Sequence, residues 1–131
     1  MMATKKTPAI KHNINTSNSL KRKRSKKYYQ TKEWRNKRTK KKKQDRKKDM
    51  ERVVDFYESH SHISSFDLNK FLYESDMPMC AQCEEEERLT PAYYLDHIHR
   101  IRAGGDKFND DNLQWLCKHC DAVKRSAEGR E

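Results

Sequence analysis

Apolar residues are sparse in the first third of the chain and fall into helical spacing only from Met50 onward. From there they recur at i, i+3, i+4 and i+7, in Met50, Val53, Val54 and Tyr57. This period predicts an amphipathic helix that starts at Met50. The preceding segment, residues 26–49, is compatible with a helix but has almost nothing to bury, so we expect it to order fully only on a partner.

A second short helix is indicated by a capping pattern. Ser64 followed by Asp67 is typical of a helix N-terminus. The apolar residues of this helix are Leu68, Phe71 and Leu72, and we expect it to end near Asp76.

The pattern changes after Pro78. Residues 92–98 are rich in aromatic and branched side chains and predict a strand, and residues 113–116 predict a second strand or an extended turn. Residues 103–112, with two adjacent glycines, predict a loop between them. The acidic residues 84–87 are expected to form a solvated loop, and a helix is expected over residues 118–127. The order is two short strands and then a helix.

Composition shows why apolar burial alone does not hold such a chain together. Of 131 residues, 33% are apolar and 38% are charged. Residues 1–48 hold 20 basic and 2 acidic side chains, whereas the rest of the chain holds 10 and 18. No apolar run reaches the length of a membrane span, and residues 1–20 lack the apolar core of a signal peptide, so we expect neither anchoring nor export.

The four cysteines offer the missing stabilisation. They form two C-x2-C pairs, Cys80/Cys83 and Cys117/Cys120, separated by 33 residues. Two such turns predict one tetrahedral structural zinc site. Disulfides or a redox C-x-x-C are the alternatives, but a reducing compartment and the duplicated pair favour zinc.

The residues around these cysteines resemble the HNH endonuclease family in its phage-type form with four cysteines. The resemblance rests on four motifs in one order: Asp96-His97-Ile98, Gly104-Gly105, Asn112-Leu113-Gln114 and the second cysteine pair followed by Lys124. It covers residues 78–124, and Tyr29, Trp34, Arg35 and Arg38 resemble a further element upstream of the first pair. The extra stretch 40–75 looks like an insertion between the two.

The resemblance implies an α+β fold, a zinc-stabilised ββα-metal module that is treble-clef-like and is preceded by basic helical segments. It also implies metal-dependent hydrolysis of DNA phosphodiester bonds. His97 would be the general base and Asp96 a ligand of a catalytic Mg²⁺ or Mn²⁺. Asn112 would be a further catalytic residue, either as a metal ligand or as the group that fixes the loop near His97. These residue types suit the reaction, because it needs a base to activate water and a cation to neutralise charge.

The chain departs from the family pattern at one position. Where the family has its last His, this sequence has Asp121. A carboxylate binds hard cations, so Asp121 is our candidate second ligand of the catalytic ion, with His99 and His119 as possible substitutes. The replacement favours Mg²⁺ or Mn²⁺ over Ni²⁺ or Zn²⁺.

The basic segment predicts a polyanion as partner. Residues 21–48 carry 17 Lys and Arg with aromatic residues among them, a composition typical of DNA binding. The candidate DNA contacts are Lys21, Arg22, Lys23, Arg24, Trp34, Arg35, Arg38, Lys41, Lys42, Lys43 and Lys124.

These observations predict three parts: a disordered basic tail over 1–24, a helical DNA-binding arm over 25–76 and a nuclease domain over 77–131. The favoured function is an HNH endodeoxyribonuclease in the cytoplasm, that of the host cell for a phage protein, with phage packaging proteins as partners by family association. The alternative is a zinc-knuckle DNA-binding or regulatory protein with weakened catalysis. The sequence leaves the oligomeric state open.

Overall fold

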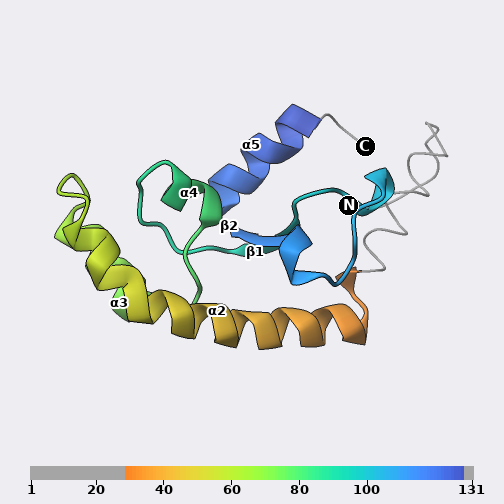
Figure 1. The fold of residues 1–131 in the computed structure, drawn as a ribbon, viewed down its shortest axis with the longest axis horizontal. Helices are drawn as coiled ribbons and strands as arrows, with labels where there is room; N and C mark the ends of the chain where they lie inside the picture. The colour runs from red at the N-terminus through yellow and green to blue at the C-terminus, as the bar shows by residue number, and fades with distance from the viewer. Residues whose placement is uncertain (1–28, 129–131) are drawn as a thin grey trace, which may run out of the picture. The chain divides into compact units, whose positions relative to one another are not determined.

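The computed structural model describes residues 29–128, which form an α+β fold with one small antiparallel sheet (Figure 1). The helices are α2 (Lys32–Glu58), α3 (Ser65–Glu74), α4 (Ala81–Glu85) and α5 (Lys118–Glu128), and the strands are β1 (Tyr94–His97) and β2 (Leu113–Leu116). Two 3-10 turns, η1 (Ile101–Ala103) and η2 (Asp110–Asn112), lie between the strands. The chain divides after Arg35, and the unit that begins at Asn36 holds both strands and all four cysteines.

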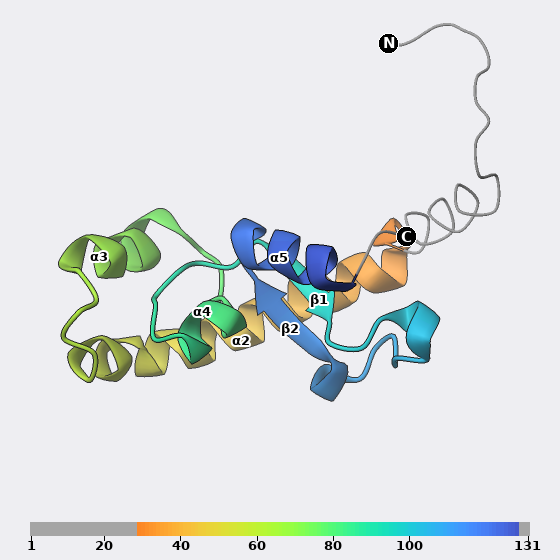
Figure 2. The same cartoon turned by 90° about the horizontal axis from the view of Figure 1, so that it is seen from above.

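The ββα order predicted for the C-terminal half is confirmed. β1 pairs with β2 in antiparallel register, with Asp96 opposite Gln114 and His97 opposite Leu113. Helix α5 packs on both strands and α4 packs on β2 (Figure 2). The predicted strand over 92–98 is shorter at both ends. Around the sheet, Leu95, Leu113 and Trp115 are buried, so this small sheet has an apolar core.

Helix α2 differs most from the sequence prediction. It is one continuous helix of 27 residues that joins the basic segment to the apolar one, because no glycine or proline interrupts it. The expected start at Met50 is therefore wrong, because the helix already begins at Lys32. Its apolar contacts also differ: Val53 is fully buried, whereas Met50 and Val54 are 40% and 47% exposed.

Polar contacts on the inner face of α2 set this register. Arg46 donates hydrogen bonds to the carbonyls of Phe71, Leu72 and Met77 at 3.1, 3.3 and 2.9 Å, and its guanidinium lies 4.5 Å from the Phe71 ring centre. It thereby pairs carbonyls at the C-terminal end of α3 that the helix itself leaves without partners. Asp49 is buried and accepts the Met79 backbone N–H at 2.8 Å.

Two core clusters result. One lies between α2, α3 and the first cysteine turn, and its buried members are Val53, Ile63, Phe71, Met79 and Leu89. The other consists of the four cysteines and Leu116. The predicted cap of α3 is confirmed, since Ser64 Oγ accepts the Asp67 N–H at 3.1 Å.

The acidic residues after Cys83 are not a simple loop. Glu84 and Glu85 end α4, and Glu87 turns the chain with a φ of 62°. Arg52 binds Glu84, so part of this acidic charge is neutralised by α2. The predicted tail 1–24 lies outside the described residues. Among residues 29–128, no helix combines the length and the apolar character needed to cross a bilayer.

Candidate active site and metal centre

Four cysteine sulfurs meet beside β2. Cys83 Sγ lies 3.8 Å from Cys117 Sγ and 3.6 Å from Cys120 Sγ, and all four sulfurs lie within 4.8 Å of one another. A tetrahedral ion with Zn–S bonds of about 2.3 Å places its sulfurs about 3.8 Å apart. A disulfide needs about 2.05 Å between its sulfurs. The cluster thus fits a metal ion and not two disulfides.

The backbone prepares these thiols as ligands. In each turn the second cysteine donates its N–H to the first sulfur, Cys83 to Cys80 and Cys120 to Cys117, both at 3.4 Å. Arg88 adds a hydrogen bond to Cys83 Sγ at 3.5 Å. Burial raises the pKa of Cys80 to about 11, so a thiolate there is stable only next to a cation. The donor set therefore suits a bound metal.

The sheet directs the side chains of Asp96 and His97 to opposite faces. Along β1, Leu95 and His97 are buried, whereas Tyr94 and Asp96 are exposed or half-buried. This alternation is the normal property of a strand. The segment that connects the strands covers the His97 face, and α5 covers the Asp96 face. Lys124 of α5 binds the Asp96 carboxylate and the backbone carbonyl oxygen of His97, at 3.2 and 3.1 Å, so the two residues share a partner although their side chains lie on opposite faces.

His97 is held in one orientation. Its side chain is buried, with 2% of the residue exposed, and Nε2 lies 3.0 Å from the Lys107 carbonyl oxygen. Because a carbonyl only accepts, Nε2 carries the hydrogen in this contact, and Nδ1 is then the basic nitrogen of the neutral ring. The fixed tautomer is what a general base requires.

Asn112 fastens the connecting segment rather than the His97 ring. Its Oδ1 accepts the His99 N–H at 2.8 Å, and its Nδ2 donates to the carbonyls of His99 and Asp106 at 3.1 and 2.8 Å. Gly105 packs so closely that a Cβ there would lie 1.9 Å from the His99 oxygen, which explains the glycine. Since Lys107, which binds His97, belongs to this segment, Asn112 acts on His97 through the loop.

Asp96 and Asp121 form the second part of the site. Asp121 lies in the first turn of α5, the helix that packs on β1. Burial raises the pKa of Asp121, and the nearby Asp96 carboxylate adds to the effect, while Arg125, 3.1 Å away, opposes it. Two carboxylates that disfavour each other's charge form a site that a cation stabilises. Asp121 thus lies near enough to Asp96 for the two charges to interact.

Lys124 is the cation present at this position. Its Nζ lies 3.2 Å from Asp96 and 2.6 Å from Glu128. Although burial works against it, these carboxylates raise the pKa of Lys124. The side chain that was a candidate DNA contact is thus an internal partner of the carboxylates.

Sequence reasoning missed three groups of the site. Gln114 donates to Asp96 Oδ2 at 3.1 Å, and it stands opposite Asp96 once the strands are paired. Glu128 follows Lys124 at i+4, a spacing that is readable from the sequence alone. The Lys107 carbonyl could not be predicted from the sequence, because it is a backbone atom of an irregular loop.

The histidines considered as substitute ligands lie elsewhere. The His99 side chain is exposed, and its backbone is used by Asn112. His119 is exposed and close enough to the α4 end to lower the pKa of Glu86, after the hydrogen bonds from Gln82 and Arg88. Asp121 is therefore the better candidate.

Several of the basic residues proposed to bind DNA contact the protein itself. Arg38 donates to the Tyr93 carbonyl at 3.0 Å, and its guanidinium lies 5.4 Å from the Trp115 ring. Lys41 pairs with Asp45 at 3.1 Å and Lys42 pairs with Asp76 at 2.7 Å.

The other proposed DNA contacts divide by exposure. Trp34 is buried, whereas Arg35 and Lys43 are exposed. Lys21, Arg22, Lys23 and Arg24 lie outside the described residues.

The chain is similar to a known protein family and to a solved structure. Residues 80–126 match the family model of the HNH endonucleases. Among solved structures, the chain is similar to the HNH endonuclease of the deep-sea thermophilic bacteriophage GVE2, crystallised with manganese ion. The identity is 20%, the match covers 89% of this chain and 94% of that chain, and the TM-score is 0.47. No curated protein matches the chain.

Proposed function

We propose, from the match of residues 80–126 to the HNH endonuclease family model, that the protein hydrolyses phosphodiester bonds of DNA with a divalent metal ion. The observation that carries the proposal is that the charge of Asp121 interacts with that of Asp96, on the strand that also holds His97. The histidine supplies a base and the two aspartates supply a cation site, and the reaction requires both.

In this proposal His97 takes a proton from the attacking water at Nδ1. The contact between Nε2 and the Lys107 carbonyl supports that assignment, because it keeps the hydrogen on the other nitrogen. Asn112 is a positioning residue, since it holds the loop that carries Lys107. The four cysteines would hold Zn²⁺ in a purely structural role.

Asp96 and Asp121 would hold a Mg²⁺ or Mn²⁺ ion, which neutralises charge on the phosphate and on the leaving oxygen. Gln114 orients Asp96 by its hydrogen bond. Lys124 must leave the carboxylate or share it when the ion binds, because its ammonium contacts Asp96 directly. Phage packaging partners and the host cytoplasm stay proposals that the family resemblance alone supports.

Metal preference tests this assignment. With supercoiled plasmid as substrate, we expect cleavage with Mg²⁺ or Mn²⁺ and little with Ni²⁺ or Zn²⁺, because both proposed ligands are carboxylates. Asp121→Asn should need at least about tenfold more metal for half-maximal rate, a loss typical of a weakened ligand shell. Gel quantification of nicked and linear plasmid over a metal titration measures both.

A matched control is Asp55→Asn, which removes an exposed carboxylate of α2 outside the site. This variant should titrate like the wild type. Strict dependence on Ni²⁺ or Zn²⁺, or an unchanged metal requirement in Asp121→Asn, would contradict the assigned ligands.

The basic face of α2 and the preceding residues are proposed to bind the DNA backbone. Lys40, Lys43 and Lys47 are exposed at i, i+3 and i+7, and no salt bridge involves them within the described part of the chain. They are therefore available to phosphates.

We expect a steep salt dependence of DNA binding. If about six basic side chains meet phosphates, the logarithm of affinity falls with the logarithm of salt concentration with a slope of roughly −5. Lys43→Ala should reduce the steepness by about 1 without a change of sequence preference. Fluorescence anisotropy of a labelled duplex from low to high salt measures the slope, and an unchanged slope would remove Lys43 from the interface.

The alternative is a DNA-binding protein with weakened catalysis. The contact of Lys124 with Asp96 favours it, because a cation already sits at the carboxylate. Tight DNA binding with no cleavage in any metal would establish this alternative.

A further inference from the structure

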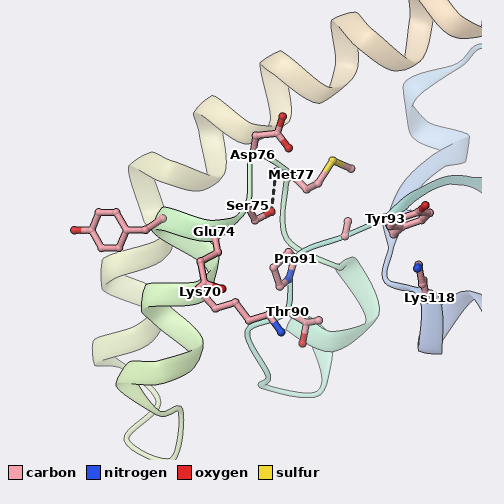
Figure 3. A pocket seen from close by; sticks show the side chains of 11 residues that line it. Lys70, Glu74, Ser75, Asp76, Met77, Thr90, Pro91, Tyr93 and Lys118 are labelled. Atoms are coloured by element: carbon pink, nitrogen blue, oxygen red, sulfur yellow. Dashed lines mark hydrogen bonds between the residues drawn. The ribbon is translucent and has the colours of Figure 1, made fainter.

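An open cleft lies beside the proposed active site. Its cavity is about 760 Å³, and it runs from the C-terminal part of α3, past the segment before β1, to the first residue of α5 (Figure 3). Lys70 and Lys118 lie on either side of Pro91 in this view, and Tyr93 stands next to Lys118.

The cleft is lined by two tyrosines, Tyr73 and Tyr93, and by two lysines, Lys70 and Lys118, of which Lys118 lies beside Tyr93. The Tyr93 residue is 50% exposed, and the Lys118 ammonium lies 4.4 Å from the centre of its ring. Neither Lys70 nor Lys118 forms a salt bridge with any residue from 29 to 128. Of the two acidic residues at the cleft, Asp76 is bound by Lys42 at 2.7 Å and Glu74 lies one turn after Lys70.

The Tyr93 ring stands on a fixed backbone. Its N–H donates to the Leu116 carbonyl at 2.8 Å, and its own carbonyl accepts from Arg38 at 3.0 Å. An exposed ring on an anchored backbone beside cations is an arrangement that can bind a base by stacking while lysines bind neighbouring phosphates. The same contacts show that removal of the ring leaves the backbone anchored.

The cleft adjoins the carboxylates. Lys118 and Asp121 share the first turn of α5, and Tyr93 precedes Asp96 by three residues. At about 3.3 Å per residue, this separation is about 10 Å, or roughly three nucleotide steps of a DNA strand. A strand held at the proposed metal site therefore reaches the cleft.

We propose that this cleft binds unpaired nucleotides next to the cleavage site, with one base stacked on Tyr93 and adjacent phosphates on Lys118 and Lys70. The proposal rests on the proposed nuclease function and names its substrate class as DNA with an unpaired segment. A base inside a duplex has both faces stacked already, so a blunt duplex gains nothing from the ring.

The test compares two labelled DNA probes, a blunt duplex and the same duplex with a three-nucleotide single-stranded overhang. Binding is measured by anisotropy with Ca²⁺ in place of Mg²⁺ or Mn²⁺. The wild type should bind the overhang probe about tenfold more tightly, the value of one base–aromatic stack. Tyr93→Ala should lower this preference below about twofold, and Tyr93→Phe should keep it.

Lys118 and a control complete the design. Lys118→Ala should weaken binding of the overhang probe and reduce its salt slope by about 1, and Lys118→Arg should restore both. Phe66→Ala removes a ring that is 68% exposed on α3 and lines no part of the cleft, so it should keep the wild-type preference.

Equal affinity of the wild type for the two probes, or a preference that Tyr93→Ala retains, would overturn the proposal. The cleavage assay separates the two hypotheses. If the protein cleaves plasmid but shows no Tyr93-dependent preference for the overhang probe, the proposed nuclease function is supported and the proposed role of the cleft is wrong. A Tyr93-dependent preference without cleavage in any metal supports the cleft as a binding site and removes the nuclease function.

Discussion

Replacing His97 by glutamine is expected to lower the rate of plasmid cleavage by about 10²- to 10⁴-fold, the contribution of a positioned general base. Glutamine keeps a polar group near the Lys107 carbonyl but has no basic nitrogen, so the loop contact survives while proton abstraction does not. The measurement is the initial rate of nicking at saturating metal and DNA.

Because His97 is buried, loss of fold must be separated from loss of chemistry. Circular dichroism and metal content of His97→Gln should match those of the wild type. His119→Ala is the control, since it removes an exposed imidazole beside the second cysteine pair and should cleave normally. If His97→Gln folds and cleaves within a few-fold of the wild type, the base lies elsewhere.

Removal of the metal from the cysteine cluster is expected to unfold the module around β1, β2 and α5. Structural zinc sites contribute about 10–16 kcal/mol of apparent binding free energy at neutral pH, which equals or exceeds the whole stability of a typical small domain, about 5–15 kcal/mol. Without the ion, four buried thiols and a sheet of two four-residue strands hold this half together.

Amide hydrogen exchange of β1 and β2 after treatment with a strong chelator measures this effect. Protection should fall in both strands, whereas the cluster around Val53 and Phe71 should lose less because its members pack largely between α2 and α3. Zn²⁺ should restore protection and Mg²⁺ should not, since soft thiolates select zinc. Unchanged circular dichroism and exchange after metal removal would exclude a structural role for the ion.

The sequence was most informative where spacing alone fixes chemistry. Cys80 and Cys83 stand in one turn and Cys117 and Cys120 in another, so their pairing into one cluster follows from two identical local motifs. β2 over Leu113–Leu116 and the cap at Ser64 are also local features, and both are confirmed.

Local patterns failed where a long-range contact set the outcome. The apolar spacing at Met50 and Val54 predicts a buried face, but Arg46 and Asp49 bind α3 and the first cysteine turn and rotate that face away. The sequence predicts Lys42 as a phosphate contact, but in the structure it binds Asp76, which lies 34 residues later in the chain.

The residue types by themselves determined that the chain carries four cysteines able to ligate one metal ion, a ββα order, and a histidine and carboxylates suited to phosphodiester chemistry. Only the tertiary structure decided which way each of these groups faces: His97 toward the Lys107 carbonyl, and Asp96 toward Asp121 and Lys124. The reason is physical. Ligand chemistry and turn spacing belong to neighbouring residues, whereas orientation and charge pairing depend on elements that meet only when the chain folds.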